Sequence, residues 1–461
     1  MSQNEDAHKV DADEIIKQDK DYLWHHIVPH KIYDKVEPMI FVEGNGLMIK
    51  DVRGREYLDA SSGGVWTVNV GYGRESIAKA VAQQLTKLNY FSGKCGTIPT
   101  IKLSEKLISL MPGLSKVYIS NSGSEANEKA FKLIRQMASL KKNEKRKIIY
   151  RYRDYHGTTI AALSATGQPN RKKQYGPMVE GFVEFPHACC YRCQFDKSYP
   201  DCNIECARAL EDVIKREDPD TVGAVIVEPI TAGGGIIPPV KEYYAILQEI
   251  CKKHEIYTIF DEVVCGFGRT GTMFGFEHYN AQPDIITMAK GMASAYVPIS
   301  ATVTSQEIFD IFLNDPADSM AYFRDISTFG GCAGATAAAL ENIKIIESEN
   351  LCENSKRMGA YLMDGLQEFK SIPIVGDVRG AGLLVGIEIV KDQTTKEPPS
   401  AQFFNKIIAD ITGQGVLVSR TTSSFENLNN TIGLAPALIV TKDQIDQIIA
   451  AIRTALEQNV L

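Results

Sequence analysis

Between Val117 and Gly291, strand-like and helix-like segments alternate along the chain, and this alternation constrains the fold more than any other feature of the sequence. Short apolar runs bounded by turn residues predict strands, and the amphipathic stretches between them predict helices. Such alternation is typical of βαβ units, whose strands form a mostly parallel sheet flanked by helices. The sequence therefore predicts an α/β fold with a mostly parallel central sheet.

The segments on either side of this region have different patterns. Residues 39–59 alternate in short runs separated by turns, which predicts a small antiparallel meander. After Phe329 we expect two long helices, at about 333–349 and 352–369, and then a short sheet and further helices. We predict an N-terminal arm and meander that belong to the small domain (1–65), a large domain (66–331) and a smaller C-terminal α+β domain (332–461).

Composition excludes several classes of function. The net charge of −7 and the isoelectric point near 5.7 argue against nucleic acid or an anionic membrane as a partner. No run approaches the roughly 18 apolar residues that a membrane span needs, and the first sixteen residues lack the apolar core of a signal peptide. Together with 10 cysteines, this predicts a cytoplasmic protein whose thiols are mostly free.

Five of the cysteines cluster between residues 189 and 206, with the spacings Cys190-x2-Cys193 and Cys202-x3-Cys206. Spacing of this kind can hold a structural zinc ion, and it fits a loop of free thiols equally well in a reducing compartment. Because the spacing departs from that of zinc knuckles, we favour free thiols and predict no metal site.

Two predicted strands each have a single charged residue at or just after their C-terminal end. The apolar run from Tyr257 ends at Asp261, and the run from Pro283 leads to Lys290. A lone charge at the end of a buried strand is costly unless it meets a partner or a ligand, and ligands of open α/β sheets lie at the carboxyl ends of the strands. An acid and an amine at one such edge suit pyridoxal phosphate, and an ordinary ion pair is an equal alternative.

A serine-rich turn, Ser120-Asn-Ser-Gly-Ser124, leads from a predicted strand into a helix. Free N–H groups and the dipole at a helix N-terminus favour anions such as phosphate. A plain N-cap by Ser122 or Ser124 explains the same residues, and by itself the cap is the better interpretation.

Six ordered motifs together resemble the class III aminotransferases, which are pyridoxal phosphate enzymes of fold type I. They are Asn-Ser-Gly-Ser-Glu-Ala (121–126), Tyr-His-Gly (155–157), Glu-Pro-Ile (228–230), Phe-Asp-Glu-Val (260–263), Met-Ala-Lys-Gly (288–291) and Ser-Thr-Phe-Gly-Gly (327–331). Each motif alone is weak, but six in this order span most of the chain. Further stretches, including residues 62–73, 190–195 and 322–331, resemble the members of that class that act on taurine and pyruvate.

The resemblance assigns roles around the cofactor ring. It implies that Lys290 joins covalently to the cofactor aldehyde and later carries a proton. Asp261 would keep the ring nitrogen protonated, with Glu228 supporting Asp261. Tyr155 would stack on one face of the ring, and Val263 would contact the other.

The same resemblance assigns the phosphate contacts. Gly123 and Ser124 match the phosphate loop, and Thr328 matches a threonine that reaches the phosphate from the neighbouring subunit. If so, a monomer has an incomplete site and we expect a homodimer, or a dimer of dimers.

Substrate residues follow from the resemblance as well. Arg420 falls where pyruvate-using members carry a mobile arginine for the acceptor carboxylate, although a simple exposed arginine explains it too. Trp66 would form an aromatic wall of the pocket, and Arg324 is a second candidate for a sulfonate. Ornithine- and GABA-type members usually have a glutamate where this chain has Gly233, so the sequence favours pyruvate over 2-oxoglutarate.

The function predicted from these features is transfer of an amino group from an ω-amino donor to pyruvate, with taurine as the expected donor. That reaction gives sulfoacetaldehyde and L-alanine. Another ω-amino acid or a simple amine, such as β-alanine, is the alternative donor, and a decarboxylase or aminomutase would not need a keto acid. A zinc-dependent binding module centred on residues 189–206 is the alternative from a different class, and no Gly-x-Gly-x-x-Gly stands where a dinucleotide enzyme needs it.

Overall fold

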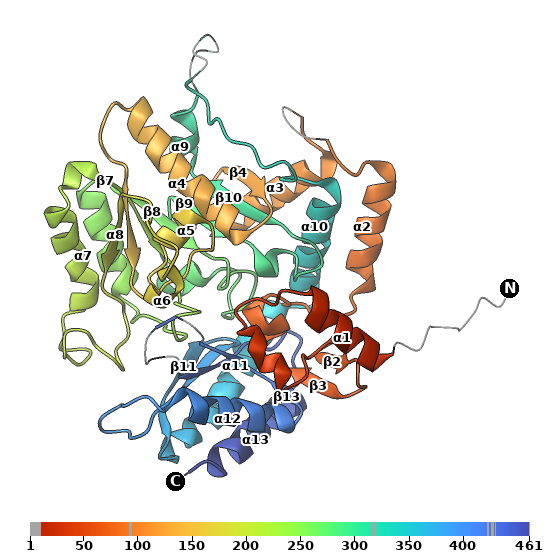
Figure 1. Ribbon diagram of the computed structural model, residues 1–461. Helices are drawn as coiled ribbons and strands as arrows, with labels where there is room; N and C mark the ends of the chain where they lie inside the picture. Colours follow the sequence, from red (N-terminus) through yellow and green to blue (C-terminus); the bar gives the residue numbers. More distant parts are fainter. Residues whose placement is uncertain are drawn as a thin grey trace.

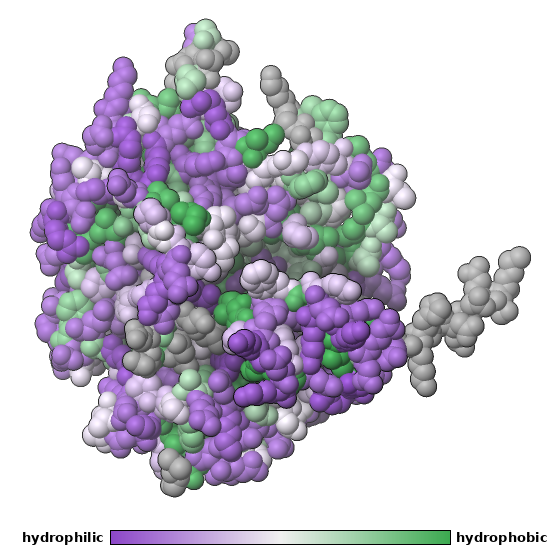
Figure 2. All heavy atoms as spheres, in the orientation of Figure 1, coloured by the Kyte–Doolittle hydropathy of each residue, from purple (hydrophilic) through white to green (hydrophobic). Residues whose placement is uncertain are grey.

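The computed structural model describes residues 11–91, 95–313, 315, 317, 320–421, 424–425, 428 and 430–460. Residues 1–10 of the expected N-terminal arm therefore lie outside the described residues. Figure 1 shows two parts, one built on the central sheet and a smaller one that contains the C-terminal helices. The face in Figure 2 is mostly hydrophilic, with apolar residues in scattered groups and a hollow near its middle.

The central sheet has seven strands in the order β4-β10-β9-β8-β7-β5-β6. Strands β5 to β9 pair in parallel, whereas β10 pairs antiparallel with both β9 and β4. The predicted α/β fold with a mostly parallel sheet is confirmed. The strands are β4 (Lys116–Ser120), β5 (Lys147–Arg151), β6 (Phe182–Phe185), β7 (Val222–Val227), β8 (Tyr257–Asp261), β9 (Ile285–Met288) and β10 (Ser300–Thr304).

Helices cover both faces of this sheet because successive strand residues point to opposite faces. On one face, β7 residues such as Val225 and Val227 pack with α7 (Glu205–Arg216) and α8 (Tyr243–Lys253). On the other face, Ala224 and Ile226 of the same strand pack with α4 (Gly123–Leu140) and α5 (Ile160–Ser164). All six residues of β7 are buried, as expected for a strand inside such a sandwich.

Two four-stranded sheets form the smaller part. One has the order β1-β2-β3-β13, and its β3–β13 pair joins the N-terminal meander to the C-terminal part of the chain. The other has the order β11-β12-β15-β14. Their strands are β1 (Phe41–Asn45), β2 (Met48–Asp51), β3 (Glu56–Asp59), β11 (Val375–Ala381), β12 (Leu384–Ile389), β13 (Val416–Leu417), β14 (Ser419–Arg420) and β15 (Thr431–Leu434).

Helices α10 and α11 link the two parts. α10 packs against α2 and α3 of the larger part, and one hydrophobic core continues from there to α11, α12 and α13. The division at residues 331/332 therefore stays a proposal about the fold. The helices not yet given are α1 (Ala12–Tyr22), α2 (Glu75–Lys87), α3 (Ile98–Leu110), α6 (Pro169–Lys172), α9 (Gln306–Asp310), α10 (Ala333–Ser348), α11 (Leu351–Gln367), α12 (Ala401–Gly413) and α13 (Lys442–Glu457). Among the described helices, none is both long and apolar enough to cross a bilayer.

Candidate active site

Asp261 and Lys290 come from neighbouring strands at one edge of the central sheet. Asp261 is the last residue of β8, and it pairs across the sheet with Thr287 of β9. Lys290 follows the end of β9 by two residues. Because the two strands are parallel, their carboxyl ends bring the acid and the amine to the same edge. No hydrogen bond or ion pair joins the two side chains in the described part of the chain, so they are not the ordinary ion pair of the alternative interpretation.

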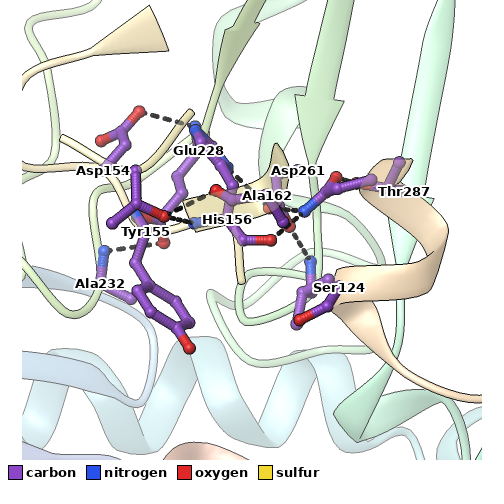
Figure 3. Close-up of polar contacts among 12 residues, drawn as sticks. Ser124, Asp154, Tyr155, His156, Ala162, Glu228, Ala232, Asp261 and Thr287 are labelled. Atoms are coloured by element: carbon purple, nitrogen blue, oxygen red, sulfur yellow. Dashed lines mark hydrogen bonds and ion pairs between the residues drawn. The ribbon is translucent and has the colours of Figure 1, made fainter. Parts of the chain in front are cut away.

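Three donors hold the carboxylate of Asp261. Its Oδ2 accepts a hydrogen bond from Asn127 Nδ2 at 2.8 Å and lies 2.8 Å from His156 Nδ1, which donates when the ring carries its proton there. Its Oδ1 accepts from the backbone N–H of Val263 at 3.0 Å. Figure 3 shows this cluster beneath the ends of the strands. Asp261 is buried, so these donors fix a charged group whose orientation is set before any ligand binds.

Glu228 is a second buried carboxylate, and backbone groups hold it. Its two oxygens accept from the N–H groups of Tyr155 at 2.9 Å and Ala232 at 3.1 Å. Burial, followed by the charges of Asp154 and Asp261, raises the pKa of Glu228 well above its ordinary value. The site therefore concentrates acidic groups that a cationic partner would stabilise.

The turn after β5 is held by a fully buried ion pair. Arg151 contacts Asp154 with atoms 3.0–3.1 Å apart, and Asp154 Oδ2 accepts from the backbone N–H of Glu228 at 2.9 Å. Arg151 also donates to the carbonyl of Glu228 at 2.5 Å. These bonds join the end of β7 to the turn that carries Tyr155, so the two segments form one rigid wall.

Lys290 lies beside an aromatic ring. Its Nζ is 5.3 Å from the ring centroid of Trp66, whose indole N–H donates to Ser419 Oγ at 2.9 Å. Trp66 ends a glycine-containing turn, Ser62–Trp66, in which Gly63 and Gly64 adopt positive φ. Burial lowers the pKa of Lys290, while Glu228 and Asp261 act in the opposite direction. A half-buried lysine with a lowered pKa has more of the free amine that nucleophilic attack needs.

The N-terminus of α4 combines a cap with a close backbone approach. Ser122 Oγ accepts from the N–H of Glu125 at 3.2 Å, so the cap interpretation is confirmed for Ser122. Ser124 has a different role, since its Oγ accepts from the N–H of Thr158 at 3.0 Å. A Cβ at Gly123 would lie 3.0 Å from Val263 Cγ2, which explains why glycine stands there. The first N–H groups of the helix have no partner within it, so this end can also receive an anion.

Three predicted residues lie away from this cluster. Thr328 is exposed, and its carbonyl accepts from the hydroxyl of Tyr90. Arg324 is exposed four residues earlier on the same segment, and within the described residues it makes no contact with Trp66, Tyr155 or Lys290. Arg420 is exposed at the end of β14, beside Ser419, and its guanidinium donates to Asn405 Oδ1 on α12. One chain therefore brings Trp66 together with the residues predicted to contact the cofactor ring and with Gly123 and Ser124. It does not bring Thr328, Arg324 or Arg420 to the same place.

Sequence reasoning missed two residues of the cluster. Asn127 on α4 donates to Asp261 and to the carbonyl of His156, and its own Oδ1 accepts from Thr287 Oγ1 at 2.7 Å. His156 stands in the Tyr-His-Gly motif (155–157), but the sequence patterns assign it no role. A signal for Asn127 exists in the sequence, because an amide on the apolar face of an amphipathic helix is expected to have a buried partner.

The cysteine-rich loop is separate from this site. All ten cysteines are free, and within the described residues no group of three or more His, Cys, Asp or Glu side chains is arranged to hold a metal ion. Burial raises the pKa of Cys206 to about 12, which disfavours the thiolate that a metal requires.

Comparison with known proteins agrees with the geometry. The family model described as "Aminotransferase class-III" matches residues 31–456. The chain belongs to the class III aminotransferases. Its fold is likewise shared with a solved Bacillus anthracis aminotransferase, at a TM-score of 0.93 and 41% identity over 97% of this chain and 98% of that one.

Among curated relatives, this class III aminotransferase is 56% identical over 447 residues to a taurine–pyruvate aminotransferase of Bilophila wadsworthia, covering 96% of this chain and 97% of that protein. It is 50% identical to a hypotaurine/taurine–pyruvate aminotransferase of Paracoccus denitrificans, covering 98% of each. A solved ω-transaminase from Pseudomonas jessenii in complex with PMP aligns with a TM-score of 0.91 at 32% identity, covering 96% of this chain and 98% of that one.

Proposed function

We propose that this class III aminotransferase uses pyridoxal phosphate to move the amino group of taurine to pyruvate, giving sulfoacetaldehyde and L-alanine. The observation that carries the proposal is the placement of Lys290, Asp261 and Trp66 at one edge of the sheet. The similarity to enzymes named for taurine and pyruvate supports the choice of substrates. A cytoplasmic location is part of the same proposal.

The residues present fit the cofactor. Asp261 Oδ1 has one hydrogen-bond donor, the N–H of Val263, and a carboxylate oxygen can accept more than one. Two buried carboxylates, Glu228 and Asp261, suit the positive charge of a protonated ring nitrogen. The amides at the start of α4 suit a phosphate, because they add fixed partial positive charge at the helix N-terminus.

When bound, pyridoxal phosphate supplies an aldehyde that exchanges amino groups and a ring that withdraws electrons. In the proposed chemistry, Asp261 holds a proton on the ring nitrogen, and Asn127 and His156 hold Asp261 in place. The Lys290 amine would take a proton from the donor carbon that bears the amino group and deliver it to the aldehyde carbon of the cofactor. Tyr155 and Val263 confine the ring from its two faces.

The acceptor side of the proposal concerns Arg420. Its planar fork suits the carboxylate of pyruvate. The guanidinium donates to the neutral Asn405, and no glutamate stands at Gly233 to compete for it. A hydrogen bond to a neutral amide costs less to break than an ion pair with a carboxylate. Arg420 can therefore turn toward the acceptor when pyruvate binds.

A homodimer completes the proposed site through Thr328. The segment that carries Thr328 also exposes large apolar side chains, including Ile326 and Phe329 at 68% and 65%. Such groups on a surface are typical of a protein interface. Arg324, on the same segment, would reach a donor sulfonate only across that interface. Replacing Arg324 by alanine tests this, since an unchanged KM for taurine would remove it from the candidates.

A panel of amino donors with pyruvate tests the function. L-alanine formed with taurine, together with sulfoacetaldehyde, supports the proposal. Turnover only with β-alanine or simple amines would replace taurine by the second candidate, which the fold shared with ω-transaminases favours. Turnover without any keto acid would contradict the transaminase assignment for this chain.

A further inference from the structure

The segment from Tyr322 to Thr328 has alternating exposure. Tyr322, Arg324, Ile326 and Thr328 are exposed, whereas the residues between them are partly buried. A period of two is that of an extended chain, in which successive side chains point to opposite sides. The segment belongs to the connection from α9 to α10, which runs beside α4 (Figure 1). One row of side chains therefore points out of the molecule, and the other is held against it.

The inward row is anchored on elements around the central sheet. The ring of Phe323 packs edge-on against Tyr118 of β4, with centroids 5.6 Å apart. Ser327 Oγ donates to Glu125 Oε1 on α4 at 3.4 Å. Asp325 stands between these two contacts, so all three members of the inward row contact the same part of the molecule.

Asp325 makes the strongest of these contacts. Its carboxylate accepts from Lys129 Nζ at 2.5 Å and from Lys132 Nζ at 2.7 Å, both on α4. The side chains of Asp325 and Lys129 are only 3% and 7% exposed. The backbone carbonyl of Asp325 also accepts from the hydroxyl of Tyr118 at 2.9 Å. Hydrogen bonds between charged groups are short and strong, so this ion pair fixes the segment on α4.

The same helix begins at the proposed phosphate site. Glu125 Oε2 accepts from the N–H groups of Asn121 at 2.7 Å and Ser122 at 3.1 Å, which closes the turn before Gly123. The other oxygen of Glu125 accepts from Ser327. The segment is therefore held at a fixed place relative to the phosphate end of α4, while its exposed row extends away from the chain.

We propose that Asp325 is a positioning residue for the neighbouring subunit's cofactor site, because its contacts on α4 set where Thr328 reaches across the interface. This inference rests on the proposed function, in which Thr328 completes that site. Asp325 itself touches neither substrate nor cofactor. Only three residues separate it from Thr328, a span of about 10 Å at most, so a shift at Asp325 is passed on to Thr328.

Hybrid dimers test the inference, because it predicts an effect on the neighbouring site alone. One chain carries Lys290→Ala, so only the site of the other chain can hold pyridoxal phosphate covalently. Two different affinity tags separate the hybrid from the homodimers. In the first hybrid Asp325→Asn is placed on the Lys290→Ala chain, and in the second it is placed on the chain that keeps Lys290. Absorbance titration with pyridoxal phosphate gives the affinity of the covalent site.

The two hybrids should differ. We expect the dissociation constant to rise about tenfold in the first hybrid, within the range for impairing a hydrogen bond to a charged group. In the second hybrid, whose covalent site is completed by an unchanged segment, it should change less than about twofold. Asp325→Glu in the first arrangement should recover part of the affinity, because it restores the charge. Glu211→Gln on α7 also removes a carboxylate joined to two lysines, and as the matched control it should change neither hybrid.

A second variant controls for folding. Asp325→Asn leaves the buried Lys129 without its charged partner, which can destabilise the chain. The double variant Lys129→Met/Asp325→Asn removes both buried charges, so its stability in urea should stay close to that of the wild type. It should still weaken the cofactor in the first hybrid and not in the second.

The outcomes separate the inference from the proposed function. Wild-type protein that binds no pyridoxal phosphate would overturn both. Monomeric protein that binds it fully would overturn the inference and leave the transaminase assignment in place, and so would an unchanged affinity with Thr328→Val on the Lys290→Ala chain. If Thr328→Val weakens the cofactor in that arrangement but Asp325→Asn affects both hybrids equally, or neither, the inference alone is overturned.

Discussion

Replacing Asn127 by leucine removes the amide that ties together three parts of the site. The wild-type amide donates to Asp261 at 2.8 Å and to the carbonyl of His156 at 2.7 Å, and it accepts from Thr287 at 2.7 Å. Leucine has the same branched arrangement of side-chain heavy atoms, so no large cavity forms. Two buried groups, the His156 carbonyl and the Thr287 hydroxyl, lose this partner at a cost of about 1–3 kcal/mol each.

Burial of the leucine offsets part of that cost, by about 1.5–3 kcal/mol. Taking the middle of each range, about 4 kcal/mol lost against about 2 kcal/mol gained, we expect the protein without cofactor to lose about 2 kcal/mol of unfolding free energy. Cofactor affinity should fall about fivefold, because one hydrogen bond that orients Asp261 contributes about 1 kcal/mol.

Urea unfolding of the cofactor-free protein and titration with pyridoxal phosphate measure the two effects. Thr287→Val is the matched control, since it removes only the hydroxyl that donates to Asn127. It should cost about 1 kcal/mol and change cofactor affinity less than about twofold. If Asn127→Leu changed neither stability nor cofactor affinity, the reasoning that this network orients Asp261 would be refuted.

Three further predictions concern other parts of the molecule. Burial, followed by the charge of Arg153, lowers the pKa of His187 from 6.5 to about 3, and its Nδ1 accepts a backbone N–H. The unfolded chain therefore takes up the proton first, and stability falls as the pH drops from 6.5 toward 3, by roughly 3 kcal/mol at pH 4.5. Urea unfolding at pH 7 and pH 4.5 should show a smaller loss in His187→Gln, and an equal loss would contradict the assignment. Arg420→Ala should raise the KM for pyruvate about 10- to 100-fold and leave propanal, an acceptor without a carboxylate, unchanged; equal effects on both acceptors would remove its proposed role. Light scattering should find a dimer for the wild-type protein and a shift toward monomer for Phe329→Glu, whereas an unshifted mass would place the interface elsewhere.

Much of the fold could be predicted because periodicity reports burial directly. The expected helices at about 333–349 and 352–369 are α10 and α11, and the strands that end near Asp261 and Lys290 are β8 and β9. Strand β10, Ser300–Thr304, was missed. Its polar residues alternate with only two apolar ones, Ala301 and Val303, so the apolar signal is weak, and its place between β9 and β4 buries it.

The site could be predicted in part for a similar reason. A lone charge that closes an apolar strand is visible in the sequence, so Asp261 and Lys290 were found. Asn127 and His156 both contact Asp261, which lies more than 100 positions away in the sequence. Local sequence patterns do not indicate such distant contacts.

Borohydride reduction of the protein loaded with pyridoxal phosphate, followed by peptide mass mapping, tests the central claim most directly. The account predicts one pyridoxyl group per chain, on Lys290, and its loss in Lys290→Ala. A pyridoxyl group on another lysine, or none in protein that transfers amino groups, would contradict the account.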